Sequence, residues 1–291
     1  FRSLKGFTQN CRTGIFTYRA APLQVSYLGY PGTMAADYVD YLIADQIIIP
    51  PQSQAAYQEK IIYLPNSYQV NDRKRVISNT VFTKAELGLP EQGFVFCSFN
   101  NNFKILPPTF ESWMRILKAV EGSVLWLFED NATAANHLSQ EAKSHGVNPG
   151  RLVFAKGMPL ADHLARHQLA DLFIDAFPCN AHTTASDALW AGLPVLTLMG
   201  NSFASRVAAS LLNAIGLPEL ITVTPQAYEA MAIELARNPE KLHALKQKLA
   251  SNRLTTPLFD TPQFTKDLEQ AYVQIYQRYQ ADLPPENIVV H

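Results

Sequence analysis

The segment from Asp171 to Leu198 constrains the fold more than any other part of the chain. It begins with an apolar run, 172–174, which predicts a buried parallel strand. A turn containing Pro and Asn follows, then a short helix that opens at His182 and ends near Gly192. The next strand is expected at 195–198. A unit of this kind places a helix N-terminus at the carboxyl end of a parallel strand.

Such a helix start favours an anion, typically a phosphate, because of its free backbone N–H groups and the helix dipole. Thr183 and Thr184 would add hydroxyl donors there, and His182 would add a ring donor. Asp187 lies about one turn deeper, where its carboxylate could accept from a ribose diol. The alternative is that the two threonines only cap the helix. Their combination with Asp187 and the Gly-Leu-Pro stop favours the binding interpretation.

From residue 87 onward, strands alternate regularly with helices, which predicts an α/β fold with a doubly wound parallel sheet. The expected strands are 94–99, 124–128, 152–155, 172–174, 195–198 and 220–223. The expected helices are 107–120, 132–145, 159–169, 182–192, 202–215, 226–237, 239–252 and a long tail helix at 261–279.

Residues 1 to about 80 show a weaker pattern of the same type. The strand candidates are 23–28, 44–49 and 61–63, and the helix candidates are 35–42 and 52–59. Three strands do not easily stand alone. We therefore expect a truncated N-terminal domain over 1–78, a polar linker at 71–78 and a complete domain over 79–291. Because the chain begins at Phe1 and not at Met, we expect it to be part of a longer protein.

The bulk composition excludes several function classes. The net charge is −1, with 47% hydrophobic and 17% charged residues, so no strong field recruits nucleic acid. No apolar run is long enough to span a membrane. The three cysteines are far apart and odd in number. They form no metal or disulfide pattern, which indicates a reducing, cytoplasmic location. P-loop, Gly-x-Ser-x-Gly and Gly-x-Gly-x-x-Gly motifs do not occur.

Ligands of open parallel sheets bind beyond the carboxyl ends of the strands. After the strand at 94–99 comes Lys104, which could neutralise the charge growing on a leaving diphosphate, although a solvated lysine is the simpler alternative. After 152–155 come His163, which could stack on a nucleobase, and Arg166, which could reach a ribose. His163 and His167 have a spacing that suits zinc, but no third ligand is evident, so we expect no metal.

The first domain offers a glycine-containing turn, 28–33, before a predicted helix that Thr33 could cap. The alternative interpretation of this segment is an ordinary strand-to-helix turn.

Several motifs of the chain together resemble the catalytic region of the O-linked N-acetylglucosamine transferases, a glycosyltransferase family 41 type that includes bacterial homologues and the Spindly-like branch. The motifs are 20–25, 28–33, 99–105, 123–127, 168–171, 179–187, 190–192, 204–208 and 257–259.

This resemblance implies a GT-B glycosyltransferase with two Rossmann-like domains, the second complete and the first in part. It implies inverting transfer of N-acetylglucosamine from UDP-GlcNAc to Ser or Thr of proteins, without metal or other cofactor. Lys104 would be the catalytic residue of this chain. The implied nucleotide-sugar-binding residues are Leu28, Gly29, Asn101, Phe103, Lys104, Met158, His163, Arg166, Cys179, His182, Thr183, Thr184 and Asp187.

The chain departs from the family at two positions. Phe103 stands where the family usually has tyrosine, so one hydroxyl contact is lost. Leu160 stands where the animal enzymes have a lysine near the base, which leaves uracil and guanine open. The resemblance implies that the family's catalytic histidine and the tetratricopeptide repeats of the parent protein would lie upstream of Phe1, so we expect this part to bind a donor better than it turns it over.

Three functions therefore remain open at this point. The first is protein O-GlcNAc transfer. The second keeps the class but changes the sugar, as in a Spindly-like GDP-fucose transferase or an asparagine glucosyltransferase. The third is a non-catalytic module that binds nucleotide sugars. Each implies a nucleotide-sugar donor, the first two imply a protein or peptide acceptor, and none involves nucleic acid or a membrane.

Overall fold

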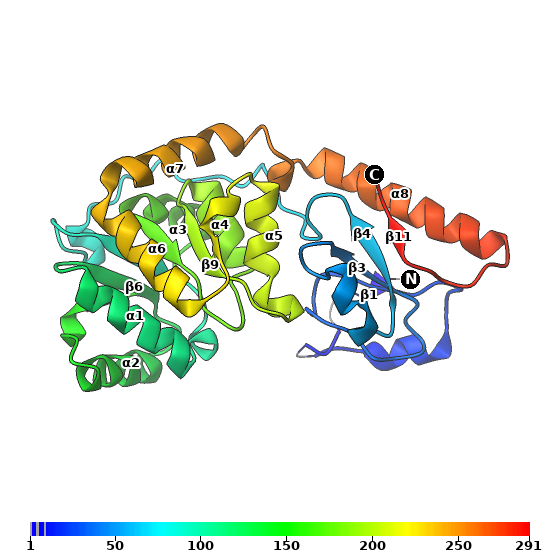
Figure 1. The fold of residues 1–291 in the computed structure, drawn as a ribbon, viewed down its shortest axis with the longest axis horizontal. Helices are drawn as coiled ribbons and strands as arrows, with labels where there is room; N and C mark the ends of the chain where they lie inside the picture. Colours follow the sequence, from blue (N-terminus) through cyan, green and yellow to red (C-terminus); the bar gives the residue numbers. More distant parts are fainter. Residues whose placement is uncertain (1, 4–5, 9) are drawn as a thin grey trace.

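The structure is a computed structural model that describes residues 2–3, 6–8 and 10–291. It contains two parallel sheets with helices packed on them, as Figure 1 shows. The sheet formed by strands between Val95 and Thr222 has six strands in the order β10-β9-β8-β5-β6-β7. Its strands are β5 (Val95–Ser98), β6 (Val124–Phe128), β7 (Leu152–Ala155), β8 (Leu172–Ile174), β9 (Val195–Leu198) and β10 (Ile221–Thr222).

Every pairing in this six-stranded sheet is parallel. The strands are almost entirely apolar and buried, which is expected when helices cover both faces. Counted from β5, the strand order is that of a dinucleotide-binding Rossmann fold. All six strands predicted for this region are present, so the predicted doubly wound sheet is confirmed.

The helices of this region lie within one residue of the predicted bounds, except that the helix predicted at 202–215 begins only at Val207 and the helix predicted at 159–169 ends at Arg166. They are α1 (Pro107–Ala119), α2 (Ala132–Ser144), α3 (Leu160–Arg166), α4 (Thr183–Ala191), α5 (Val207–Ala214), α6 (Pro225–Arg237) and α7 (Pro239–Asn252). Side chains of Asn131, Thr224 and Asn238 accept from backbone N–H groups at the starts of α2, α6 and α7. Gly192 ends α4 in the left-handed conformation, with φ of 88°.

The other sheet has five strands in the order β1-β2-β3-β4-β11, again all parallel. They are β1 (Arg2–Ser3), β2 (Val25–Ser26), β3 (Tyr41–Asp45), β4 (Lys60–Leu64) and β11 (Ile288–Val289). The predicted helix at 35–42 is wrong, because β3 occupies its end and irregular chain its beginning. The predicted helix at 52–59 is only a 3₁₀ segment, Pro51–Ala56. The strand expected at 44–49 lies earlier, over β3.

The remaining short 3₁₀ segments lie at turns between these elements. They are Thr13–Tyr18, Ala85–Leu87, Asn102–Lys104, Pro149–Arg151, His167–Leu169, Phe203–Ser205, Pro218–Leu220 and Pro257–Phe259.

The tail helix α8 (Thr261–Gln280) packs on the five-stranded sheet, which we call the first sheet because it contains the N-terminal strands. After α7 the chain crosses back, and α8 lies along β4 and β11 (Figure 1). The strand β11 then adds to β4, with Ile288 opposite Ile62. The tail helix, which we assigned to the second domain from its sequence, thus packs on β4 and β11, and its domain assignment stays a prediction. The boundary near residue 78 stays a prediction.

Polar contacts join the two sheets at the carboxyl ends of their strands. The buried carboxylate of Asp45, at the end of β3, accepts from the Ser210 hydroxyl on α5 at 2.6 Å and from the Tyr68 N–H at 2.8 Å. Arg206 donates to the carbonyls of Ile47 and Gly200, at 2.6 and 2.9 Å. The carboxyl ends of both sheets are thereby brought to one interface, where a ligand can touch both.

Candidate functional site

The candidate site lies where the strand order of the six-stranded sheet reverses. β5 and β8 are neighbours, yet the chain continues from β5 toward β6 and from β8 toward β9, in opposite directions. Open α/β sheets bind their ligands at such a switch point, beyond the carboxyl ends of the strands. The exit of β5 carries Lys104, and the exit of β8 leads to the start of α4.

The loop before α4 is held by one buried carboxylate. Asp175 accepts from the Ala181 N–H at 2.7 Å and from the Thr197 hydroxyl at 2.7 Å. Burial raises the pKa of Asp175 to about 6, while the hydrogen bonds and the charge of Lys104 oppose that rise. The loop therefore delivers the start of α4 to a fixed position at the sheet edge.

Among the described residues, no side chain caps the start of α4. His182 is the N-cap residue, and its ring makes no capping hydrogen bond. The Thr184 hydroxyl donates to Asn100 Oδ1 at 2.9 Å and so is not the free donor that we expected. Thr183 is exposed. The helix start therefore presents backbone N–H groups and the Thr183 side chain, the arrangement that favours an anion.

Lys104 lies beside this helix start, as expected. Its Nζ donates to the carbonyl of Asn180 at 2.6 Å, two residues before His182. Burial and the nearby Lys104 charge lower the pKa of His182 to about 4, so this ring is neutral at neutral pH. The His182 Nε2 lies 3.5 Å from the Ala204 carbonyl oxygen. Of these two side chains, Lys104 rather than His182 therefore supplies the positive charge beside the helix start.

A pocket of about 410 Å³ joins this helix start to the first sheet. Its lining includes Leu28 and Gly29 from the first sheet and His182 and Thr183 from α4. The predicted meeting of these two segments is therefore present. Its other lining residues are Tyr68, Gln69, Val70, Asn71, Asp72, Arg75 and Ser186.

The turn that faces α4 from the first sheet is strained and firmly held. Leu28 has φ of 69°, which is unfavourable for a branched residue, and the Gly29 N–H donates to the Tyr27 carbonyl at 2.9 Å. The buried carboxylate of Glu59 accepts from the Thr33 hydroxyl at 2.6 Å and from the Met34 N–H at 2.5 Å. Thr33 therefore caps no helix, which corrects our expectation.

Residues 69–75 form a strap between the sheets, and this strap overlaps the linker predicted at 71–78. In this strap Arg75 forms an ion pair with Asp187 and donates to the Ser186 hydroxyl at 3.2 Å. Burial raises the pKa of Asp187, and the charge of Arg75 opposes that rise. Sequence reasoning missed Arg75 because no local pattern links it to a helix more than a hundred residues away.

His163 belongs to a cluster of aromatic and basic side chains with Phe99, Arg166 and His167. Its ring lies 5.1 Å from Phe99 and 4.7 Å from His167. Burial and the Arg166 charge lower the pKa of His163 to about 4, so its ring is neutral at neutral pH. A neutral, half-buried ring at a strand exit suits the predicted stacking on a base.

Arg166 does not occupy the position that we expected. Its side chain is 1% exposed, and it donates to the Lys156 carbonyl at 2.7 Å and contacts His163 Nδ1 at 2.6 Å. Its guanidinium also lies 4.5 Å from the Phe99 ring centre. The buried side chain therefore supports His163, and the direct ribose contact expected for Arg166 is not available in this structure.

The other predicted residues lie around the rim without forming a common contact. Asn101 and Phe103 are exposed, Phe103 by 69%, while Met158 and Cys179 are half-buried. No group of three or more His, Cys, Asp or Glu residues suited to a metal ion occurs in the described part of the chain. The binding roles of these residues and the absence of a metal stay predictions.

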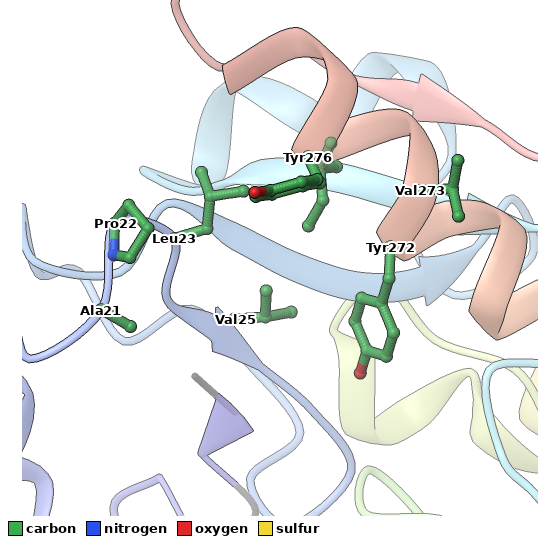
Figure 2. Close-up of a pocket in the computed structure, with 8 residues that line it drawn as sticks. Ala21, Pro22, Leu23, Val25, Tyr272, Val273 and Tyr276 are labelled. Carbon is green, nitrogen blue, oxygen red and sulfur yellow. The ribbon is translucent and has the colours of Figure 1, made fainter. Parts of the chain in front are cut away.

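A larger cavity, of about 610 Å³, lies between α8 and the first sheet. Figure 2 shows Tyr272, Val273 and Tyr276 of α8 lining it together with Pro22 and Leu23. It carries no charged side chain, so it does not suit a phosphate. Within the described ranges, no helix combines the length and apolar character needed to cross a membrane.

A family model for glycosyl transferase family 41 matches residues 2–81 and 76–268. A protein of Arabidopsis thaliana, named as a probable UDP-N-acetylglucosamine–peptide N-acetylglucosaminyltransferase, is 39% identical over 99% of this chain and 30% of its own length. A UDP-N-acetylglucosamine–peptide N-acetylglucosaminyltransferase of Caenorhabditis elegans is 27% identical over 98% of this chain and 34% of its own length. The chain thus spans about a third of these relatives.

Solved structures of other proteins have a fold similar to that of this chain. A mutant O-GlcNAc transferase from Thermobaculum terrenum superposes with a TM-score of 0.79 at 30% identity, over 90% of this chain and 49% of that one. A sucrose-phosphate synthase from Thermosynechococcus elongatus superposes with a TM-score of 0.62 at 13% identity, over 91% of this chain and 71% of that one. The second likeness concerns the fold alone.

Proposed function

The chain belongs to glycosyl transferase family 41, and from this membership and its cleft geometry we propose that it forms the donor-binding part of a UDP-GlcNAc:protein O-GlcNAc transferase. Its two parallel sheets with helices are of the GT-B type. The observation that carries the proposal is the start of α4, which lies beside Lys104 at the switch point and faces the Leu28–Gly29 turn across the pocket.

In this proposal the diphosphate lies against the start of α4. The backbone N–H groups of α4 and the Thr183 hydroxyl donate to phosphate oxygens, and Lys104 faces the oxygen that leaves. An acceptor hydroxyl attacks the anomeric carbon and gives its proton to a general base, the bond to the diphosphate breaks, and negative charge grows on UDP. A preorganised cation stabilises that charge most strongly as it develops. The Leu28–Gly29 turn would contact the sugar from the other sheet.

The nucleoside would extend from the diphosphate toward two separate groups. His163 supplies a neutral ring for stacking on the base, supported from behind by Arg166. Asp187, in the second turn of α4, supplies a carboxylate for the ribose. The acceptor protein and upstream tetratricopeptide repeats of a longer parent protein belong to the same proposal.

Calorimetry tests this proposal. We expect the chain to bind UDP more tightly than GDP, and to bind UDP equally well in excess EDTA. A tighter GDP complex would favour the fucosyltransferase alternative, and an affinity drop of about tenfold or more on chelation would overturn metal-independent binding. Donor hydrolysis by an active form of the enzyme would exclude the non-catalytic module.

A further inference from the structure

The 69–75 strap contacts α4 at Ser186 and Asp187. The Ser186 hydroxyl donates to Asn71 Oδ1 at 2.5 Å, and the Asn71 side chain in turn donates to the Leu258 carbonyl at 3.3 Å. Arg75 then reaches Asp187 and Ser186 together. The strap is thus bound to the same helix turn that carries the predicted ribose ligand.

Arg75 is itself fixed from several directions. Its Nε donates to the Asp72 carbonyl at 3.1 Å, and its own carbonyl accepts from Trp190 Nε1 at 3.0 Å. Its guanidinium carbon lies 5.9 Å from the ring centres of both Trp190 and Phe259. A planar guanidinium held in this way fixes the direction of its charge and its donors.

The ion pair engages one oxygen of Asp187 and leaves the other available. Arg75 binds Oδ1, and Oδ2 makes no hydrogen bond within the described part of the chain. The two side chains are only 14% and 9% exposed, so water screens the pair weakly. A cation in direct contact favours the ionised form of a carboxylate this buried.

We propose that Arg75 is a positioning residue for the nucleotide, which acts through Asp187 by holding Oδ1 so that Oδ2 accepts from the ribose. This inference rests on the proposed function. It also assigns a role to the strap, because the contact between the sheets then orients the residue that reads the ribose.

Arg253 provides a matched control for Arg75. Its guanidinium carbon lies 5.4 Å from the same Trp190 ring, and it donates to the Trp190 carbonyl at 2.8 Å. It therefore supports the end of α4, but it forms no ion pair with Asp187. A purely structural role for Arg75 predicts that the Arg75→Met and Arg253→Met variants behave alike.

The experiment measures by calorimetry how much more tightly each variant of the 291-residue chain binds UDP than 2′,3′-dideoxy-UDP. We expect Arg75→Met to reduce this preference by about fivefold or more, and Arg253→Met to change it by less than about twofold. Arg75→Lys, which keeps the charge but not the planar guanidinium and its paired N–H donors, should retain part of the preference. Adding Arg75→Met to Asp187→Asn should cause no further loss, because both act through one contact.

The outcomes separate the two proposals. If the unaltered chain binds no UDP, the proposed function fails and this inference falls with it. If the unaltered chain prefers UDP to the dideoxy analogue and Arg75→Met keeps that preference, only the positioning role is overturned. A stronger preference in Arg75→Met would mean that Arg75 competes with the ribose for Asp187, which also overturns it. Thermal unfolding of each variant shows whether it is folded. If Arg75→Met does not fold, the comparison is made with Arg75→Lys instead.

Discussion

Two basic residues lie beside the first turns of α4, and they differ in the groups that they contact. Lys104 donates to a neutral carbonyl, that of Asn180, at 2.6 Å. Arg75 is paired with a carboxylate, that of Asp187. The charge of Lys104 is therefore available to an incoming anion, whereas the charge of Arg75 is already balanced inside the protein. In the proposed function, one end of the site stabilises a phosphate and the other holds a polar group in place.

The two carboxylates near α4 show the same contrast. Asp175 is surrounded by neutral donors, and burial raises its pKa to about 6. Asp187 has a cation in direct contact, which opposes the effect of burial. Asp175 thus holds the loop before α4, and Asp187 contacts a cation that favours its ionised form.

The strongest test of this contrast is Lys104→Ala. If the charge of Lys104 serves the leaving diphosphate, kcat of an active form of the enzyme should fall about 100-fold or more. Donor affinity should change much less, because the ground-state diphosphate is also held by the start of α4. Steady-state kinetics with varied donor concentration measure both quantities.

The control is Lys143→Ala, which removes an exposed lysine from α2, far from the pocket along the sheet. It should leave both kinetic constants unchanged. A rise in KM without any loss of kcat in Lys104→Ala would make Lys104 a ground-state binding residue, and the contrast with Arg75 would disappear.

The second test concerns the acceptor at the other end. Asp187→Asn should weaken UDP about ten- to a hundredfold, because a charge-assisted hydrogen bond is worth roughly 1.5–3 kcal/mol. Binding of 2′,3′-dideoxy-UDP should change little. If instead both nucleotides weaken equally, Asp187 does not contact the ribose, and the nucleotide lies along the cleft differently.

The six-stranded sheet could be predicted from sequence because each of its strands carries its own signal. A continuous apolar run such as β8 or β9 needs no partner to be recognised, and Pro or Gly marks the adjoining helix ends. The start of α4 and its meeting with Lys104 followed from the rule for strand exits. The exposed and half-buried rim residues came only from family resemblance.

The first sheet could not be predicted in the same way because its order depends on distant segments. β11 is separated from β4 by more than two hundred residues, and its two residues carry no periodic signal. The pairing of Arg75 with Asp187 joins residues that are 112 positions apart in the sequence. Arg166 was misplaced for a related reason: sequence shows which face of a helix a residue lies on, but not whether neighbouring side chains cover it.

A third test uses pH to separate the two carboxylates. The folded-state pKa of Asp175, about 6, lies above its ordinary value of 3.8. The folded protein therefore holds this proton more tightly, and the stability it contributes is present at low pH and lost as pH rises through 6. The free energy of unfolding, wild type minus Asp175→Asn, should be larger at pH 5 than at pH 7.5 by about 1.4 kcal/mol.

Chemical denaturation at the two pH values measures this difference. Both proteins contain the same histidines, including His182, so the contributions of those rings largely cancel in the subtraction. A difference that stays constant between pH 5 and 7.5 would show that Asp175 does not titrate there, and the environments of Asp175 and Asp187 would then be more alike than we infer.

The smallest expected effect decides between capping and binding at the start of α4. Thr183 is exposed, and within the described residues no side chain caps this helix. Thr183→Ala should therefore change the free energy of unfolding by less than about 0.5 kcal/mol. If its hydroxyl donates to a phosphate, UDP should weaken by about two- to tenfold, the range for one hydrogen bond. Uridine, which lacks the diphosphate, should bind the variant and the wild type equally well. A stability loss of about 1 kcal/mol with unchanged UDP affinity would instead identify Thr183 as a cap. The anion site would then consist of backbone groups and Lys104 alone.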